Sequence, residues 1–198
     1  VYKELEARIT VDSGANTLVF AGGVKLISGG TLILCPVSPG TLVFVNKPIE
    51  IGGDTLQAET KGTSVLGVAG NTFGTLKIAN HATVRTDAAG ALSPGCLLDV
   101  GGTWDADALL DMNGFDQTVG SIRTDGRATS PGYLAVTSAL PATLTVNQNG
   151  GTTYKGDIAG AVSLVKNGTG MILFSNVVST TTGEIVLNAG TIALAEDS

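Results

Sequence analysis

The sequence predicts an all-β fold in which short parallel strands stack on one another as a β-solenoid. A phrase of Gly or a turn residue, then Thr, then alternating apolar residues recurs along the chain, and turn residues separate its copies. No apolar pattern of helical length occurs between them. Gly accounts for 28 of the 198 residues and only 14% are charged, a strand-and-turn composition. The clearest copies of the phrase are Gly30–Leu34, Gly40–Phe44, Gly74–Ile78 and Gly190–Leu194.

Each element follows from its local pattern. Residues 1–12 alternate charged and apolar side chains and predict a strand or, as an alternative, a short helical cap; this segment would cap the solenoid or dock to another body. Short apolar runs six to ten residues apart predict strands from residue 13 to about 58, and further runs continue from 64 to 86. Residues 87–95 predict a longer loop and 123–131 a polar excursion, after which short strands return. The early runs are centred on Leu18, Leu26, Leu32, Leu42, Ile49 and Leu56.

The expected architecture is a right-handed parallel β-helix of about nine coils. Three short strands per turn take about 20–25 residues, and about 4.8 Å per stacked strand gives a rod roughly 40–45 Å long. A single turn is too thin to bury its own apolar face, so neighbouring turns must cover it. Residues 1–198 are therefore expected to form one continuous domain.

Charge excludes several classes of partner. The net charge is −6, and Lys and Arg are scattered singly, which disfavours nucleic acid and anionic membrane surfaces. No stretch approaches the roughly 20 apolar residues of a membrane span, so we expect no membrane insertion by this chain. No charged-then-apolar leader opens the sequence, so an export signal is expected outside it. No motif indicates a cofactor.

The chain has two cysteines, Cys35 and Cys96, and one histidine, His81. Both cysteines lie in apolar runs, and the pattern leaves open a disulfide or, preferably, two buried thiols. With one histidine, the set does not support a zinc site or a catalytic triad, and His81 is expected in a turn.

The acidic residues Asp105, Asp107, Asp111 and Asp116 are close in sequence. They suggest Ca²⁺ binding or an acid pair for polysaccharide cleavage, but their spacing matches no Ca²⁺ loop and a solvated loop is preferred. We therefore predict no catalytic residue and no metal ligand.

Two further patterns have simpler structural interpretations. Gly160, Gly168 and Gly170 flank Lys166 but lack the ending of a phosphate-binding loop, so they are expected at corners. Asn167 begins a glycosylation-like triplet that is attributed to chance. The aromatic residues are too dispersed for a sugar-stacking platform and are expected to pack singly. The residues considered for such a platform are Phe73, Trp104, Phe115, Tyr133 and Tyr154.

Residues 151–195 contain a more specific sequence motif. Leu164-Val165-Lys166-Asn167-Gly168-Thr169-Gly170 is followed by a strand, a polar corner and Asn188-Ala189-Gly190-Thr191-Ile192. This resembles the β-strand repeat associated with autotransporter passengers, and the segment 110–122 resembles a second phrase of such passengers. The resemblance implies a parallel β-helix that is secreted or exposed at a bacterial surface, without implying an activity.

The function expected from these observations is a non-enzymatic structural or adhesive segment, a β-helical stalk that presents loops. Its partners would be a host or neighbouring-cell surface, through glycan or protein. One alternative is a fibre subunit that self-associates end to end through open solenoid ends. Another is a polysaccharide lyase or hydrolase, which would need convergent charged residues on successive coils.

Overall fold

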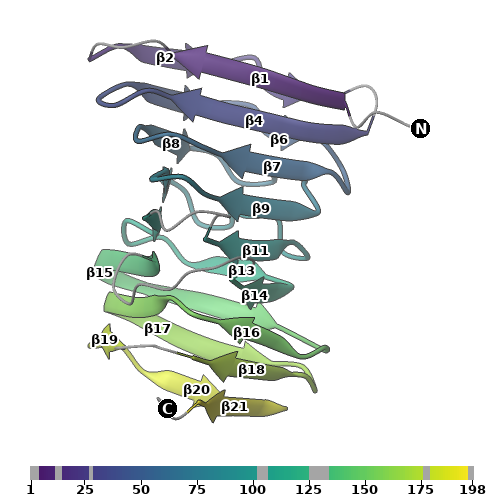
Figure 1. Ribbon diagram of the computed structural model, residues 1–198, viewed down its shortest axis with the longest axis vertical. Coiled ribbons are helices and arrows are strands. Elements are labelled where there is room, and N and C mark those ends of the chain that lie inside the picture. The colour runs from purple at the N-terminus through teal and green to yellow at the C-terminus, as the bar shows by residue number, and fades with distance from the viewer. Residues whose placement is uncertain are drawn as a thin grey trace.

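The computed structural model describes residues 5–11, 15–26, 29–101, 107–124, 134–175 and 179–195. In these residues the chain winds into a stack of short strands, and no helix occurs among them (Figure 1). The strands are β1 (Leu5–Val11), β2 (Thr17–Phe20), β3 (Val24–Lys25), β4 (Gly30–Pro36), β5 (Thr41–Phe44), β6 (Ile49–Glu50), β7 (Thr55–Ala58), β8 (Thr63–Leu66), β9 (Thr75–Ile78), β10 (Thr83–Thr86), β11 (Leu97–Val100), β12 (Ala108–Asp111), β13 (Gln117–Val119), β14 (Ser121–Arg123), β15 (Leu134–Asn147), β16 (Thr152–Tyr154), β17 (Asp157–Asn167), β18 (Met171–Phe174), β19 (Thr180–Thr181), β20 (Ile185–Leu187) and β21 (Thr191–Leu194).

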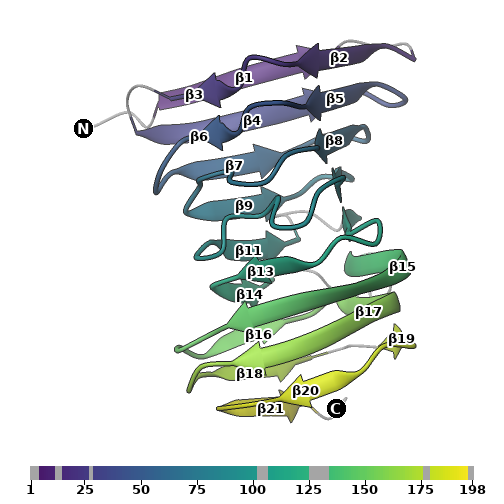
Figure 2. The ribbon, with the colours of Figure 1, turned by 180° about the vertical axis from the view of Figure 1, so that it is seen from behind.

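The strands line three faces, and neighbours on each face pair in parallel. The first face runs β1-β4-β7-β9-β11-β14 and then β16-β18-β21. The amide of Thr124 donates to the carbonyl of Thr153 at 2.9 Å and joins the two groups. The second face runs β2-β5-β8-β10-β12-β15-β17-β19. The third face contains β3, β6, β13 and β20, and the second halves of β15 and β17 complete it (Figure 2).

Paired strands lie 20 to 27 residues apart, so most turns have the expected 20–25 residues and those that contain β12, β13 and β15 are longer. Thr31 pairs with Thr55 and Thr55 with Thr75, while Leu5 pairs with Gly30. The chain therefore completes about eight turns, slightly fewer than the nine expected, because these longer turns use more residues than the sequence estimate allowed. The predicted β-solenoid class is confirmed.

The interior is built from ladders of identical or similar apolar side chains. On the first face Leu32, Leu56, Leu76, Leu98 and Ile122 stack in register, and none is more than 1% exposed. Burying each such side chain contributes about 1.5–3 kcal/mol relative to exposure. Each of these side chains is covered by its counterparts in the coils on either side. This stabilisation therefore requires the neighbouring coils to be in place.

The second-face ladder contains one polar exception. Leu42 stacks on Ser64, which stacks on Val84. The Ser64 hydroxyl is buried and has no hydrogen-bond partner in the described part of the chain. A hydroxyl in this situation costs stability, because it has left water without a replacement partner.

Three buried amide side chains stitch successive coils together on the third face, where the backbone pairing is interrupted. Asn71 accepts from the amide of Ile49 at 2.7 Å and donates to the carbonyl of Ala91 at 2.7 Å. These partners belong to the coils before and after its own. Gln148 acts in the same way, since it accepts from the Ile122 amide at 3.3 Å and donates to the Met171 carbonyl at 2.6 Å. Gln117 bonds the preceding coil alone, where it accepts from the Leu92 amide at 3.0 Å and donates to the Ala88 carbonyl at 2.8 Å.

The outer surface carries threonine ladders and exposed apolar residues at one end. Thr41, Thr63 and Thr83 stack in register on the second face. At the last described coil, Ile185, Leu187 and Leu194 are 50–79% exposed.

No helix in the described ranges is long and apolar enough to cross a membrane. The single-domain organisation and the role of residues 1–12 as a cap stay predictions; β1 is the first strand of the first face.

Candidate binding surface

The acidic residues that are close in sequence do not converge. Asp107 lies beside His81, Asp111 ends β12 on the outer face, and the Asp116 carboxylate accepts from the amide of Thr143 at 2.7 Å. Asp105 lies outside the described residues. Within the described ranges no group of three or more His, Cys, Asp or Glu side chains could hold a metal ion.

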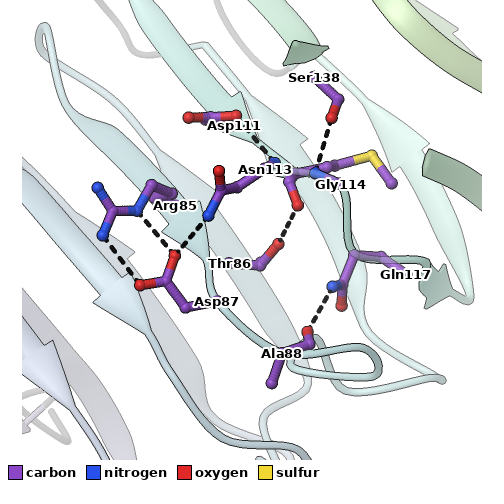
Figure 3. A network of polar contacts seen from close by, with 10 residues as sticks. Arg85, Thr86, Asp87, Ala88, Asp111, Asn113, Gly114, Gln117 and Ser138 are labelled. Atoms are coloured by element: carbon purple, nitrogen blue, oxygen red, sulfur yellow. Dashed lines mark hydrogen bonds and ion pairs between the residues drawn. The ribbon is translucent and has the colours of Figure 1, made fainter. Parts of the chain in front are cut away.

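A polar network surrounds Arg85 on the outer side of β10 (Figure 3). The guanidinium donates to both carboxylate oxygens of Asp87, at 2.8 and 2.9 Å, and the Asn113 amide donates to Asp87 Oδ1 at 2.9 Å. The hydrogen bonds from Arg85 lower the pKa of Asp87, and the same contacts raise the pKa of Arg85. Both side chains are partly exposed, so the pair contributes only about 0.2–1 kcal/mol.

The segment 110–122, which resembles a second passenger motif, contains a hydrogen-bonded turn at Asn113-Gly114. Asp111 Oδ1 accepts from the Asn113 amide at 2.9 Å, and the Gly114 amide donates to the Ser138 hydroxyl at 2.9 Å (Figure 3). Asn113 and Gly114 both have positive φ, which Asn and Gly adopt more readily than other residues. These groups bind the preceding and following coils, so their chemistry is structural.

Lys166, the first residue of the Lys-x-Gly-x-Gly segment, is a buried lysine that binds backbone carbonyl groups. In β17 it occupies an inward position between Val146 and Leu187 of the adjacent coils and is fully buried. Its ammonium donates to four backbone carbonyl oxygens, and the shortest contacts are those to Asn167, at 2.6 Å, and Gly168, at 2.8 Å. Burial lowers the pKa of Lys166. The four acceptors offset part of the cost of burying the charged form.

The glycines of this segment are required by close backbone contacts, as expected for corners. Gly168 has φ 76°, and a Cβ there would lie 2.4 Å from the Gln148 carbonyl oxygen. A Cβ on Gly170 would lie 2.0 Å from the carbonyl oxygen of Gly150. Asn167 donates to Asn147 at 2.9 Å and accepts from the next coil's asparagine, so its side-chain amide is part of an asparagine ladder.

The two cysteines are free and buried, without a disulfide. Burial raises the pKa of the Cys96 thiol to about 12 and, despite the nearby guanidinium of Arg8, also raises the pKa of Cys35. Neither thiol is therefore a nucleophile at neutral pH. The interpretation as two packed thiols is confirmed.

The aromatic residues form no platform in the described chain. Phe73 and Tyr154 are buried in the core, and Tyr154 meets Phe174 edge to face with ring centroids 5.9 Å apart. Phe115 is partly buried in the turn before β13. Trp104 and Tyr133 lie outside the described residues.

A recess of about 400 Å³ lies at the corner where the first face meets the second. We call it the corner groove. Its lining comes from three successive corners, at residues 37–38, 59–61 and 80–81. His81 lies in the turn between β9 and β10, as expected, and its Nδ1 is 3.7 Å from Asp107 Oδ2.

The groove arises from unequal corner lengths on strands that stay in register. Leu34, Ala58 and Ile78 stack at the end of the first face, and Thr41, Thr63 and Thr83 stack at the start of the second. The corner in the second coil therefore has two more residues than the two corners that follow it. Val37 and Ser38, from this longer corner, form one wall of the recess.

A second recess of about 300 Å³ lies among residues 22–25, 47–48 and 50. Its two ammonium groups belong to Lys25 and Lys47, and Lys25 pairs across the strands with Glu50. Sequence reasoning did not predict either recess. Both depend on how corners of different coils align, which a local pattern does not record; only the difference in spacing between successive Thr-Leu phrases points to them.

No model of a known protein family matches this chain, and no solved structure matches it either. Among curated proteins, the adhesin BmaC autotransporter of Brucella suis biovar 1 (strain 1330) is 30% identical over 190 residues. The match includes 96% of this chain, which spans about 4% of the length of that adhesin. With the solenoid fold, this confirms the predicted resemblance: the chain is a β-solenoid stretch similar to an autotransporter adhesin, with the extracellular or cell-surface location that such a passenger has.

Proposed function

We propose that the chain is a rigid, non-enzymatic stalk segment of a bacterial surface adhesin that also contributes adhesive contacts along its corners. The observation that carries this proposal is the uninterrupted apolar ladder of the first face, which runs in register from Leu32 to Ile122. Such a stack resists bending, because displacing one coil exposes the ladders of both neighbours. The similarity to an adhesin supports an adhesive role for the whole protein.

The stalk role is tested by pulling the purified chain from its two ends in a force spectrometer. A stack of coils should lengthen in steps of one or a few coils, each coil of 20–27 residues releasing roughly 65–95 Å of extended chain. Extension at low force without discrete steps would contradict a rigid stalk.

The adhesive role is tested by coating beads with the folded chain and measuring their retention on epithelial cells under flow. Beads with the heat-unfolded chain and beads with albumin are the controls. Retention that requires the folded chain supports adhesion by this segment, whereas retention equal to albumin would leave a stalk without adhesive contacts.

End-to-end self-assembly is a second candidate, favoured by the apolar residues on the last described coil. Leu187 and Leu194 are 50% and 79% exposed, although they lie in strands whose counterparts in earlier coils are buried. Unpaired strand edges of this kind accept another strand. Sedimentation velocity of the chain should then show concentration-dependent assembly that Leu194→Lys abolishes and Leu140→Lys, at a 59% exposed lateral site, does not. A monodisperse monomer at all concentrations would exclude it.

A further inference from the structure

We propose that the corner groove is a binding site for an uncharged saccharide. This deepens the adhesive role proposed above and rests on it. The recess of about 400 Å³ falls in the range of small-ligand sites, roughly 300–1,000 Å³. It is bounded by loops held by the solenoid strands, so the polar groups are placed by a scaffold that does not need to move.

The backbone conformation of the groove is unusual. Five non-glycine residues in the described chain have positive φ, and three of them, Thr60, Asn80 and His81, line this recess. Their φ values are 75°, 52° and 68°. A β-branched residue such as Thr60 rarely adopts this conformation, and residues of this kind gather at ligand sites more than elsewhere.

The strained residues are held in place by neighbouring coils. The Thr60 hydroxyl donates to the carbonyl of Pro36 at 2.6 Å, and the His81 amide donates to the carbonyl of Asp107 at 2.7 Å. Asn80 Oδ1 is buried at this corner and accepts no hydrogen bond from any described residue. A ligand that brings a donor to this corner, after a small rotation of that amide, would supply the missing partner.

The charges in and around the groove balance, which selects the ligand class. Lys61 and Arg8 are positive, while the Glu59 carboxylate, which pairs with Arg8 at 3.5 Å, and the Asp107 carboxylate, 3.7 Å from His81 Nδ1, are negative, so the four formal charges sum to zero. With charges of both signs at the groove, a ligand of either charge is attracted by one group and repelled by another, so net charge gives it no advantage. The hydroxyls of a neutral sugar both donate and accept, and so match an ammonium, a hydroxyl, an imidazole and an amide in one recess.

The test is residue-specific NMR of the ¹⁵N-labelled chain titrated with lactose, maltose and cellobiose at millimolar concentrations. We expect at least one of them to shift the amide signals of Thr60, Lys61 and His81 while those of Gly22 and Gly23, in the second recess, stay unchanged. Sialyllactose and a heparin disaccharide are the acidic probes. Stronger binding of either acidic probe at this groove would overturn the neutral-sugar assignment, and so would the absence of groove shifts with every probe.

Substitutions separate the groove from its surroundings. Lys61→Ala removes one charge-assisted donor and should weaken sugar binding about tenfold, which corresponds to ~1.4 kcal/mol. Lys47→Ala, at an exposed lysine of the second recess, is the matched control and should have no effect. His81→Asn keeps a residue that tolerates positive φ, so it should preserve the fold and still reduce affinity. Equal affinity of Lys61→Ala, His81→Asn and the parent chain would refute the proposal.

Failure of this inference can be told apart from failure of the adhesive role. If beads coated with Lys61→Ala are retained on cells as well as the parent chain while sugar binding is absent from both, adhesion stands and the groove assignment is wrong. If the sugar binds but folded beads are not retained, the groove is a ligand site and adhesion by this segment fails.

Discussion

Replacing Lys166 by Met tests whether the buried ammonium holds the corner between β17 and β18. Met keeps most of the apolar stem and removes the charge. The change deletes the two short hydrogen bonds to the carbonyls of Asn167 and Gly168, at 2.6 and 2.8 Å. A hydrogen bond to a charged group contributes about 1.5–3 kcal/mol net, so two of them predict a loss of about 3 kcal/mol or more.

The assay is urea unfolding followed by circular dichroism, combined with amide hydrogen exchange, because a repeat array can open locally before it unfolds globally. Lys166→Met should lower the free energy of unfolding and speed exchange at Gly170 and Asn188, whose amides donate to carbonyls at this corner. Lys77→Met, on the outer side of β9, is the control and should change stability by less than about 0.5 kcal/mol.

The opposite result is physically possible and would refute this reasoning. Buried charged groups are sometimes replaced by apolar ones with a gain in stability, when desolvation outweighs the contacts. If Lys166→Met is as stable as the parent chain and exchange at the corner is unchanged, the four carbonyl contacts do not stabilise the coil. The conformation of the Lys-x-Gly-x-Gly corner would then depend on the glycines alone.

Three further predictions concern stability. Gly170→Ala should cost about 1–3 kcal/mol in urea unfolding, because its Cβ would lie 2.0 Å from a carbonyl oxygen, whereas Gly151→Ala, with nothing within 4 Å, should be neutral; similar losses in both would contradict the contact argument. Ser64→Ala should raise the free energy of unfolding by about 1 kcal/mol, since it removes a buried hydroxyl without a partner; a loss would mean that the hydroxyl is satisfied. Burial raises the pKa of Cys96 from 9.0 to about 12, so the stability that the neutral thiol contributes is complete below pH 9 and is lost as the pH rises toward 12. The free energy of unfolding should fall by at most ~1.4 kcal/mol per pH unit over this range. Cys96→Ala should flatten this alkaline decline, and an unchanged decline would exclude Cys96 as its cause.

The fold could be predicted because its main signal repeats. Leu32, Leu56 and Leu76 each follow a Thr, and the same pair of residues stacks directly in the structure. Periodicity of this kind needs no knowledge of distant contacts. The number of turns was overestimated by about one because corners differ in length, so counting residues per coil gives only an approximate total.

The candidate groove could not be predicted, for a physical reason. Glu59 and His81 are 22 residues apart in the sequence and line one recess because their coils are in register, and Val37 and Ser38 complete it because their corner is longer. Lys166 is an intermediate case. It alternates with Leu164 along β17, so strand parity alone would have placed it inside, but a charged side chain is ordinarily assigned to the surface.

The unequal corners carry a consequence for how such a surface can diversify. Because strand register is fixed by the stacked ladders, the corner at 35–40 is two residues longer than the corners at 59–62 and 79–82 without any shift of the paired positions on either side. Insertions at this edge are therefore decoupled from the integrity of the rod. A lineage could vary its recognition chemistry there, one coil at a time, while the scaffold beneath keeps the same shape.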